Sequence, residues 1–204
     1  MFQIAQIVQA AQGTGQDRLA ILRDGEKVIV LIADGAGGRS GGSEAAELAI
    51  RLMSGRAMSL TSAADCERLL RDVDRAVAID TAAGETTATL VVVNPTNLFG
   101  ASVGDSGAWI VGSATIDELT GNQVPKPFLG TGASMPVSFA RSACSGTLLV
   151  ATDGLLKYSS REMIANAVGK ESLDEALVLL VGLVRYPSGA LPDDLAIVLC
   201  RRVP

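Results

Sequence analysis

Two apolar runs of this sequence end in the same way, with Asp followed by Gly. They are VIVLIADGAGG at residues 28–38 and LLVATDGLL at residues 148–156. Short apolar runs bounded by turn residues predict buried strands, so each aspartate would lie where a strand leaves the core. An ionised carboxylate is costly there unless it is paired or binds a metal ion. The glycine that follows permits a sharp turn and leaves room for a ligand. Either Asp-Gly pair alone is more often an ordinary turn, and only their recurrence points to a site.

Other acidic residues share this position at the ends of expected strands. Asp105 follows the strand LFGASV, Asp193 and Asp194 open the last strand, and Asp17 closes a glycine-containing turn before a strand. Carboxylates from separate strand ends, without His or Cys ligands, describe a site for a hard cation such as Mg²⁺ or Mn²⁺. Two such ions about 3.5–4 Å apart could share a water molecule and make it hydroxide-like beside a phosphoryl group.

The sequence contains no histidine, and this excludes several kinds of catalysis. Ser-His-Asp and Cys-His mechanisms and histidine-ligated zinc all need that side chain. Two segments are typical of serine hydrolases, GDSG at 104–107 and GASVG at 100–104. Both families use a histidine as general base, so neither motif is expected to act as a nucleophile here.

Composition restricts the partners and the location. The chain has 204 residues with 48% hydrophobic content, which predicts a single domain over 1–204. A net charge of −5 without any basic tract, and only 3% aromatic residues, argue against nucleic acid binding. No apolar run reaches the roughly 18–20 residues that cross a bilayer, so we expect no membrane partner and a cytoplasmic monomer. The three cysteines, Cys66, Cys144 and Cys200, are interpreted as buried or incidental thiols.

The order of elements predicts an α+β fold, a four-layer α-β-β-α sandwich with two central antiparallel sheets flanked by helices. Short turns between strands favour antiparallel pairing, and the paired helices favour outer layers. Helices are also expected after two capping boxes, Ser159 with Glu162 and Ser172 with Glu175, and Ser62 with Asp65 has the same spacing. The expected strands are 2–8, 18–24, 27–34, 86–94, 97–104, 108–112, 114–119, 136–143, 147–153 and 193–201, with helices at 43–53 and 59–79 and an irregular segment at 121–136.

Taken in order, seven segments resemble the PPM family, the metal-dependent type 2C protein serine/threonine phosphatases. They are GQDR (15–18), ADGAGG (33–38), GETTATLVVV (84–93), GDSGAWIV (104–111), LTGNQVPKPFLGTG (119–132), ATDGL (151–155) and PDDLAIV (192–198). The resemblance extends over nearly the whole chain and implies the same sandwich fold, with a dinuclear site for two Mn²⁺ or Mg²⁺ ions at one end. It also implies a compact bacterial-type member.

The resemblance implies a role for each acidic residue. Asp34 would bridge both metals, and Gly35 would offer its backbone carbonyl to one of them. Asp153 and Asp193 would complete the ligands of the other metal, with Asp194 in the place of the family's Asn. Asp17 would hold metal-bound water, and Asp105 would help a weaker third site. Asp17, Asp34 and Asp153 are thus the expected catalytic residues. Thr86 and Thr87 match the family's strand entry, but they are equally well explained as ordinary strand residues.

Several positions depart from the family pattern. Gln12 stands where an arginine usually grips the substrate phosphate, Gln16 replaces an acidic neighbour of the first metal, Ala36 replaces a His or Met, and Gly107 replaces an arginine. The flap that contacts substrate also looks shortened, within about 112–146. The metal ligands are retained, whereas phosphate binding and leaving-group protonation are weakened, so we expect slow turnover or dependence on a docked protein partner.

The resemblance implies a function on phosphoproteins. The leading hypothesis is hydrolysis of phosphoserine and phosphothreonine by a hydroxide bound to the two metals, paired with a Ser/Thr kinase. One alternative is a catalytically weak or silent module that docks a phosphoprotein. Another is an enzyme of the sporulation or stress-response branch, which acts on small regulatory proteins.

Overall fold

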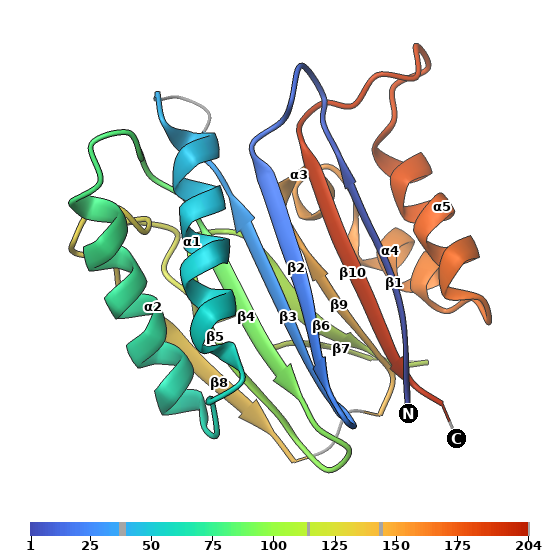
Figure 1. The fold of residues 1–204 in the computed structure, drawn as a ribbon. Coiled ribbons are helices and arrows are strands. Elements are labelled where there is room, and N and C mark those ends of the chain that lie inside the picture. Colours follow the sequence, from blue (N-terminus) through green and yellow to red (C-terminus); the bar gives the residue numbers. More distant parts are fainter. Residues whose placement is uncertain (37–39, 114, 143–144, 204) are drawn as a thin grey trace.

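Two antiparallel sheets of five strands each form the centre of the molecule (Figure 1). The computed structural model describes residues 1–36, 40–113, 115–142 and 145–203. In the first sheet the order is β1 (Phe2–Gln9), β10 (Leu195–Arg202), β9 (Thr147–Ala151), β6 (Gly107–Val111) and β7 (Ile116–Glu118). In the second it is β2 (Asp17–Asp24), β3 (Lys27–Asp34), β4 (Ala88–Val93), β5 (Leu98–Val103) and β8 (Val137–Arg141).

Helices cover the outer face of each sheet, as Figure 1 shows. Helices α1 (Gly42–Ala57) and α2 (Ala63–Ala78) pack on the second sheet, while α4 (Arg161–Val168) and α5 (Leu173–Val184) pack on the first. A third apolar cluster lies between the two sheets. The predicted α+β sandwich with four α-β-β-α layers is therefore confirmed.

Strand β3 contains the apolar run that precedes Asp34, and both of its faces are buried. Val30 and Ile32 point into the cluster between the sheets, whereas Ile29 and Leu31 point into the cluster under α1 and α2. Successive side chains of a strand alternate between its faces, and here both faces are covered. Asp34, the last residue of β3, is the first position at which the strand is no longer fully buried.

The helix starts agree with the sequence at two of the three predicted caps. The side chains of Ser62 and Ser172 accept hydrogen bonds from the backbone three residues later, at 3.2 and 3.3 Å. The prediction for Ser159 was wrong, because Ser160 is the cap and accepts from the Met163 amide at 3.2 Å. Ser159 and Ser160 carry the same hydroxyl group. Only the serine directly before the first helical residue, with an extended backbone, can accept a hydrogen bond from the backbone amide three residues later.

Several element ends differ from the predictions. The strand expected at 147–153 ends at Ala151, and Asp153 instead begins a one-turn helix, α3 (Asp153–Leu156). Segment 121–136 is irregular as predicted, apart from a single bridge between Leu129 and Thr86. Cys66 and Cys200 are buried thiols outside any disulfide, as expected. Cys144 and residues 37–39 of the glycine-rich segment lie outside the described residues.

None of the described helices is both long enough and apolar enough to span a bilayer. Strands β1 and β10 pair over their full length, so the N- and C-terminal ends lie together (Figure 1). The single domain over 1–204 and the shortened flap within 112–146 stay predictions.

Candidate metal centre

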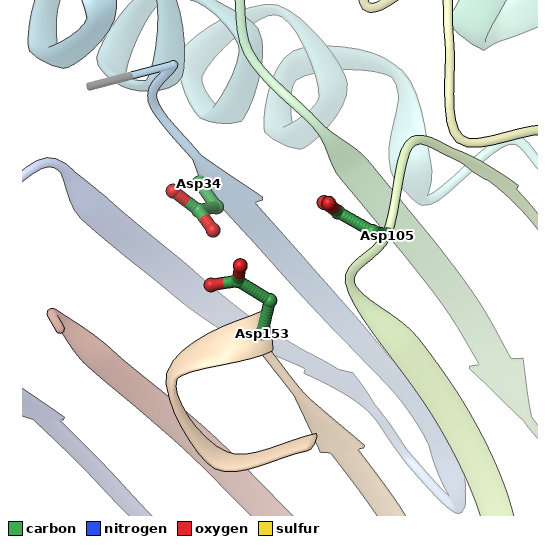
Figure 2. A group of neighbouring side chains, drawn as sticks. All are labelled: Asp34, Asp105 and Asp153. Atoms are coloured by element: carbon green, nitrogen blue, oxygen red, sulfur yellow. The ribbon is translucent and has the colours of Figure 1, made fainter. Parts of the chain in front are cut away.

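Three aspartates that are far apart in sequence meet at one end of the sandwich. Asp34 ends β3, Asp105 follows β5, and Asp153 begins α3. Each offers a carboxylate oxygen, and these oxygens all lie within 4.8 Å of one another. Figure 2 shows the three side chains directed toward a common space. The structure thus brings together carboxylates that the sequence placed only at separate strand ends.

The three aspartates line a pocket of about 450 Å³. Its other lining residues are Gln16, Gly35, Ala36, Glu85, Thr87, Lys126, Phe128, Asp193 and Asp194. Six of the lining side chains are acidic, and Lys126 is the single basic one among the described residues that line it. The pocket is therefore strongly negative, which favours a cation.

Burial and mutual repulsion raise the pKa values of this cluster. The pKa of Asp34 rises to about 10, first because of burial and then because of the charges of Asp17 and Asp153. The pKa of Asp153 is also raised, by burial and then by the charge of Asp105. Both shifts mean that burial and neighbouring negative charge outweigh any nearby positive charge, such as that of Lys157 on Asp153. A divalent cation would supply the missing positive charge.

Asp17 lies behind Asp34, directly opposite it in the pairing of β2 with β3. Asp17 is 2% exposed, and one of its carboxylate oxygens accepts a hydrogen bond from Thr152 Oγ1 at 2.7 Å. No N–H or hydroxyl group of the described residues reaches the other oxygen, and the Asp34 carboxylate is close enough to share a proton with it. Burial is the main reason that the pKa of Asp17 rises to about 7. A buried carboxylate oxygen without a donor fits a site that a metal ion and its water would complete.

Two threonines just before β4 hold the backbone of Asp34. The Asp34 carbonyl accepts from Thr86 Oγ1 and from the Thr87 amide, each at 2.8 Å. The Asp34 amide donates to Thr87 Oγ1 at 3.1 Å, and that hydroxyl lies 2.7 Å from Ser106 Oγ. The sequence left the role of these threonines open, and the structure shows that they position the aspartate. Ser106 and Thr152 were missed, although each stands next to a predicted aspartate.

The glycines of the two Asp-Gly pairs serve backbone packing. A Cβ at Gly35 would lie 2.4 Å from the Gly42 carbonyl oxygen, and one at Gly154 would lie 1.9 Å from the Asp194 carbonyl oxygen. Real Cβ atoms do not approach oxygen so closely. Neighbouring backbone thus occupies the Cβ positions of both glycines, and Gly35 in addition lines the acidic pocket.

The protein phosphatase 2C family model matches residues 9–177 of the sequence. The chain belongs to this family. The resemblance to the type 2C protein serine/threonine phosphatases is therefore confirmed. No curated protein matches the sequence.

Solved structures share the fold of this phosphatase. The serine/threonine phosphatase Stp1 from Staphylococcus aureus has a TM-score of 0.85 and 17% identity, over 100% of this chain and 96% of that one. The catalytic domain of the phosphatase PstP, in complex with two manganese ions, has a TM-score of 0.81 and 20% identity, over 100% and 99%. RsbX in complex with magnesium has a TM-score of 0.75 and 18% identity, over 98% and 93%.

The two adjacent aspartates before β10 have different surroundings in this phosphatase. Both oxygens of Asp194 are hydrogen-bonded to backbone amides, of Ala11 at 2.8 Å and of Gln16 at 2.5 Å. Asp193 accepts from the Asp194 amide at 2.9 Å, and its charge contributes to the raised pKa of Asp153. Asp194 therefore holds the turn before β2, while both aspartates line the pocket. There the charge of Asp193 acts on Asp153 and that of Asp194 on Asp17.

The positions that depart from the family pattern fall in three places. Ala36 and Gln16 line the acidic pocket and bring no ionisable group to it. Gln12 lines a neighbouring hollow that shares Asp193 with the pocket. Gly107 begins β6, where a Cβ would lie 2.7 Å from Leu156 Cδ1.

Proposed function

We propose that this phosphatase uses its strand-end aspartates to hold two divalent ions, Mn²⁺ or Mg²⁺, and to hydrolyse phosphoserine and phosphothreonine in proteins. The observation that carries the proposal is the approach of the Asp34, Asp105 and Asp153 oxygens to within 4.8 Å. The donors are hard carboxylate oxygens, which these ions prefer. The raised pKa values of Asp34 and Asp153, and the unpartnered oxygen of Asp17, fit such ions as well.

The proposed ligand set follows from the surroundings of each carboxylate. Asp34 lies at the centre and would contact both ions, with the backbone carbonyl of Gly35 beside it. Asp153 and Asp193 would complete the second site, and Asp105, which is exposed, would serve a weaker third one. Asp194 is assigned a different role, because both of its oxygens already bind backbone amides.

When bound, the ions would supply a nucleophilic water at neutral pH and stabilise charge on the phosphoryl group. Asp17 would accept a hydrogen bond or a proton through its free oxygen, since its pKa of about 7 suits that task. Thr86 and Thr87 would keep the Asp34 backbone fixed during turnover. Leaving-group protonation has no evident donor at Ala36, which supports slow turnover.

Hydrolysis of para-nitrophenyl phosphate and of phosphopeptides, with Mn²⁺ and with EDTA, tests the proposal. Asp34→Asn and Asp153→Asn should lose nearly all activity, about 10³-fold or more for a residue essential to charge stabilisation. Asp24→Asn is the matched control, because Asp24 is also followed by Gly but lies exposed at the opposite end of β2. Wild-type turnover in either site variant would refute the assignment.

A catalytically silent module that docks a phosphoprotein is the second candidate. The absence of an ionisable side chain at Ala36 and Gln16 in the pocket favours it. EDTA-sensitive turnover by the wild-type protein would exclude this candidate. Phosphoprotein binding without turnover at saturating Mn²⁺ would support it.

The remaining expectations about partners are also proposals. A cognate Ser/Thr kinase, a monomeric state and a cytoplasmic location stay predictions from the sequence. Small regulatory phosphoproteins are the proposed alternative substrates. Faster turnover of intact phosphoproteins than of matched phosphopeptides would show recognition by docking.

A further inference from the structure

Lys126 is the only basic residue among the described residues that line the acidic pocket. No acidic group of the described residues lies within ion-pair distance of its ammonium group, and its one recorded contact is with the ring of Phe128, at 5.4 Å from the centroid. A cation beside six carboxyl groups, without an ion pair, is available for an anionic ligand.

Phe128 places this cation next to the metal centre. A Cβ at Gly104 would lie 3.2 Å from Phe128 Cδ1, so the ring packs against the residue that precedes Asp105. The ring face offers negative charge to the ammonium group above it. Lys126 is thereby held over one wall of the pocket.

The loop that carries Lys126 is anchored on both sides of it. Before it, Gln123 Nε2 donates to the Ser106 carbonyl at 3.0 Å. After it, Leu129 forms a pair of backbone hydrogen bonds with Thr86, at 2.9 and 3.0 Å. Both anchors belong to segments that also hold Asp34 and Asp105.

A third anchor comes from helix α2. Asp74 is 3% exposed, and its carboxylate accepts from the backbone amides of Gly130, Gly132 and Ser134 at 2.8, 3.0 and 2.9 Å. These bonds fix the stretch after Phe128, so the loop is organised before substrate arrives. Organisation in advance lowers the entropy lost when a ligand binds.

We propose that Lys126, in the wall of the acidic pocket, binds the phosphoryl group of the substrate and of the released phosphate. This inference rests on the proposed phosphatase function. A phosphate monoester carries up to two negative charges, and an ammonium group donates charge-assisted hydrogen bonds to its oxygens. Because the contact exists in both the ground state and the transition state, it lowers KM more than it raises kcat.

Binding of inorganic phosphate to the Mg²⁺-loaded protein, measured by calorimetry, provides a test that is independent of turnover. Lys126→Ala should raise the Kd for phosphate about 10-fold, the size expected for loss of one charge-assisted hydrogen bond. Lys126→Arg should keep most of the affinity, because it retains the charge. Lys170→Ala is the control, since Lys170 lies between α4 and α5, outside the lining of the pocket.

Kinetics with para-nitrophenyl phosphate should show the same pattern, with KM raised about 10-fold in Lys126→Ala and kcat changed less. Equal melting temperatures of the metal-free variants would exclude unfolding, and Lys126→Gln replaces Lys126→Ala if they differ. Wild-type Kd and KM in Lys126→Ala would overturn this inference alone. Absence of both phosphate binding and hydrolysis in the wild-type protein would overturn the proposed function as well.

Discussion

Replacing Asp34 with Asn should stabilise the metal-free protein while it removes activity. In the absence of a cation, Asp34 is held among the charges of Asp17, Asp105 and Asp153, and its pKa is raised to about 10. Asparagine has nearly the same shape but no charge. The substitution therefore relieves repulsion that exists only because the site is built for a positive ion.

The size of the effect follows from the geometry and from the pKa. Two unit charges 4.8 Å apart repel by about 3 kcal/mol at an effective dielectric constant of about 20. Asp34 avoids that repulsion when it is protonated in the folded protein, whereas in the unfolded chain it is ionised at neutral pH. Folding with the proton bound therefore costs about 1.4 kcal/mol for each pH unit above the ordinary carboxyl pKa, or about 4 kcal/mol at pH 7. Asp34 is partly exposed, so screening reduces this to an expected gain of about 2 kcal/mol.

The sign of the pH dependence is fixed by the raised pKa. Below about pH 4 the carboxyl is protonated in both the folded and the unfolded chain, and the variant should match the wild type. As pH rises toward the folded pKa of Asp34, the metal-free wild type loses more stability than the Asn variant, in which only Asp17 and Asp153 of the carboxylate cluster keep raised pKa values. The advantage of the variant should therefore grow between pH 4 and pH 8.

Thermal unfolding in EDTA and in Mn²⁺ is the assay. A gain of about 2 kcal/mol corresponds to roughly 4–8 °C in a chain of this length. Mn²⁺ at 100 times its Kd should stabilise the wild type by about 2.7 kcal/mol and the variant by much less. The difference in melting temperature between the two proteins should therefore narrow or change sign. Asp24→Asn should change neither curve. A lower melting temperature of Asp34→Asn in EDTA at pH 8 would refute the reasoning.

Two further predictions concern backbone positions around the site. Thr87→Val removes the hydroxyl that accepts from the Asp34 amide, and it should weaken Mn²⁺ binding about 10-fold in a metal titration; an unchanged affinity would show that the threonine only fills space. Gly154→Ala would bring a Cβ to 1.9 Å from the Asp194 carbonyl oxygen and should cost more than about 3 kcal/mol in urea unfolding. Gly182→Ala, in α5 with nothing within 4 Å of the new Cβ, should instead stabilise the protein by up to about 1 kcal/mol.

The architecture was largely predictable because it depends on local periodicity. The continuous apolar run of β3 indicates burial on both faces, and the apolar stripe of α2 indicates burial on one face. Turn residues between the runs predict antiparallel neighbours. The errors were at element ends, as at Ser160 and Asp153, where two neighbouring residues had similar propensities and packing decided between them.

The residue types of the metal site could also be predicted from the sequence, whereas their geometry could not. Acidic residues after apolar strands, in a chain without histidine, predicted oxygen ligands for a hard cation. The different hydrogen bonds of Asp193 and Asp194 could not be predicted from the local sequence, because both residues follow the same turn. The amides of Ala11 and Gln16, more than 170 positions away, settle the orientation of Asp194.

The sequence by itself determined the layers of this protein and the chemical type of its site, since both follow from the hydrophobic pattern and from which residues are present. Only the tertiary structure decided which side chains meet. Two packed sheets bring the ends of β3, β5 and β9 to one place, and hydrogen bonds from remote threonines and backbone amides set where each carboxylate points. The position of Lys126 also depends on the tertiary structure. A lysine in an irregular loop has no local sequence pattern that predicts a binding role, and three anchors fix this loop beside the pocket.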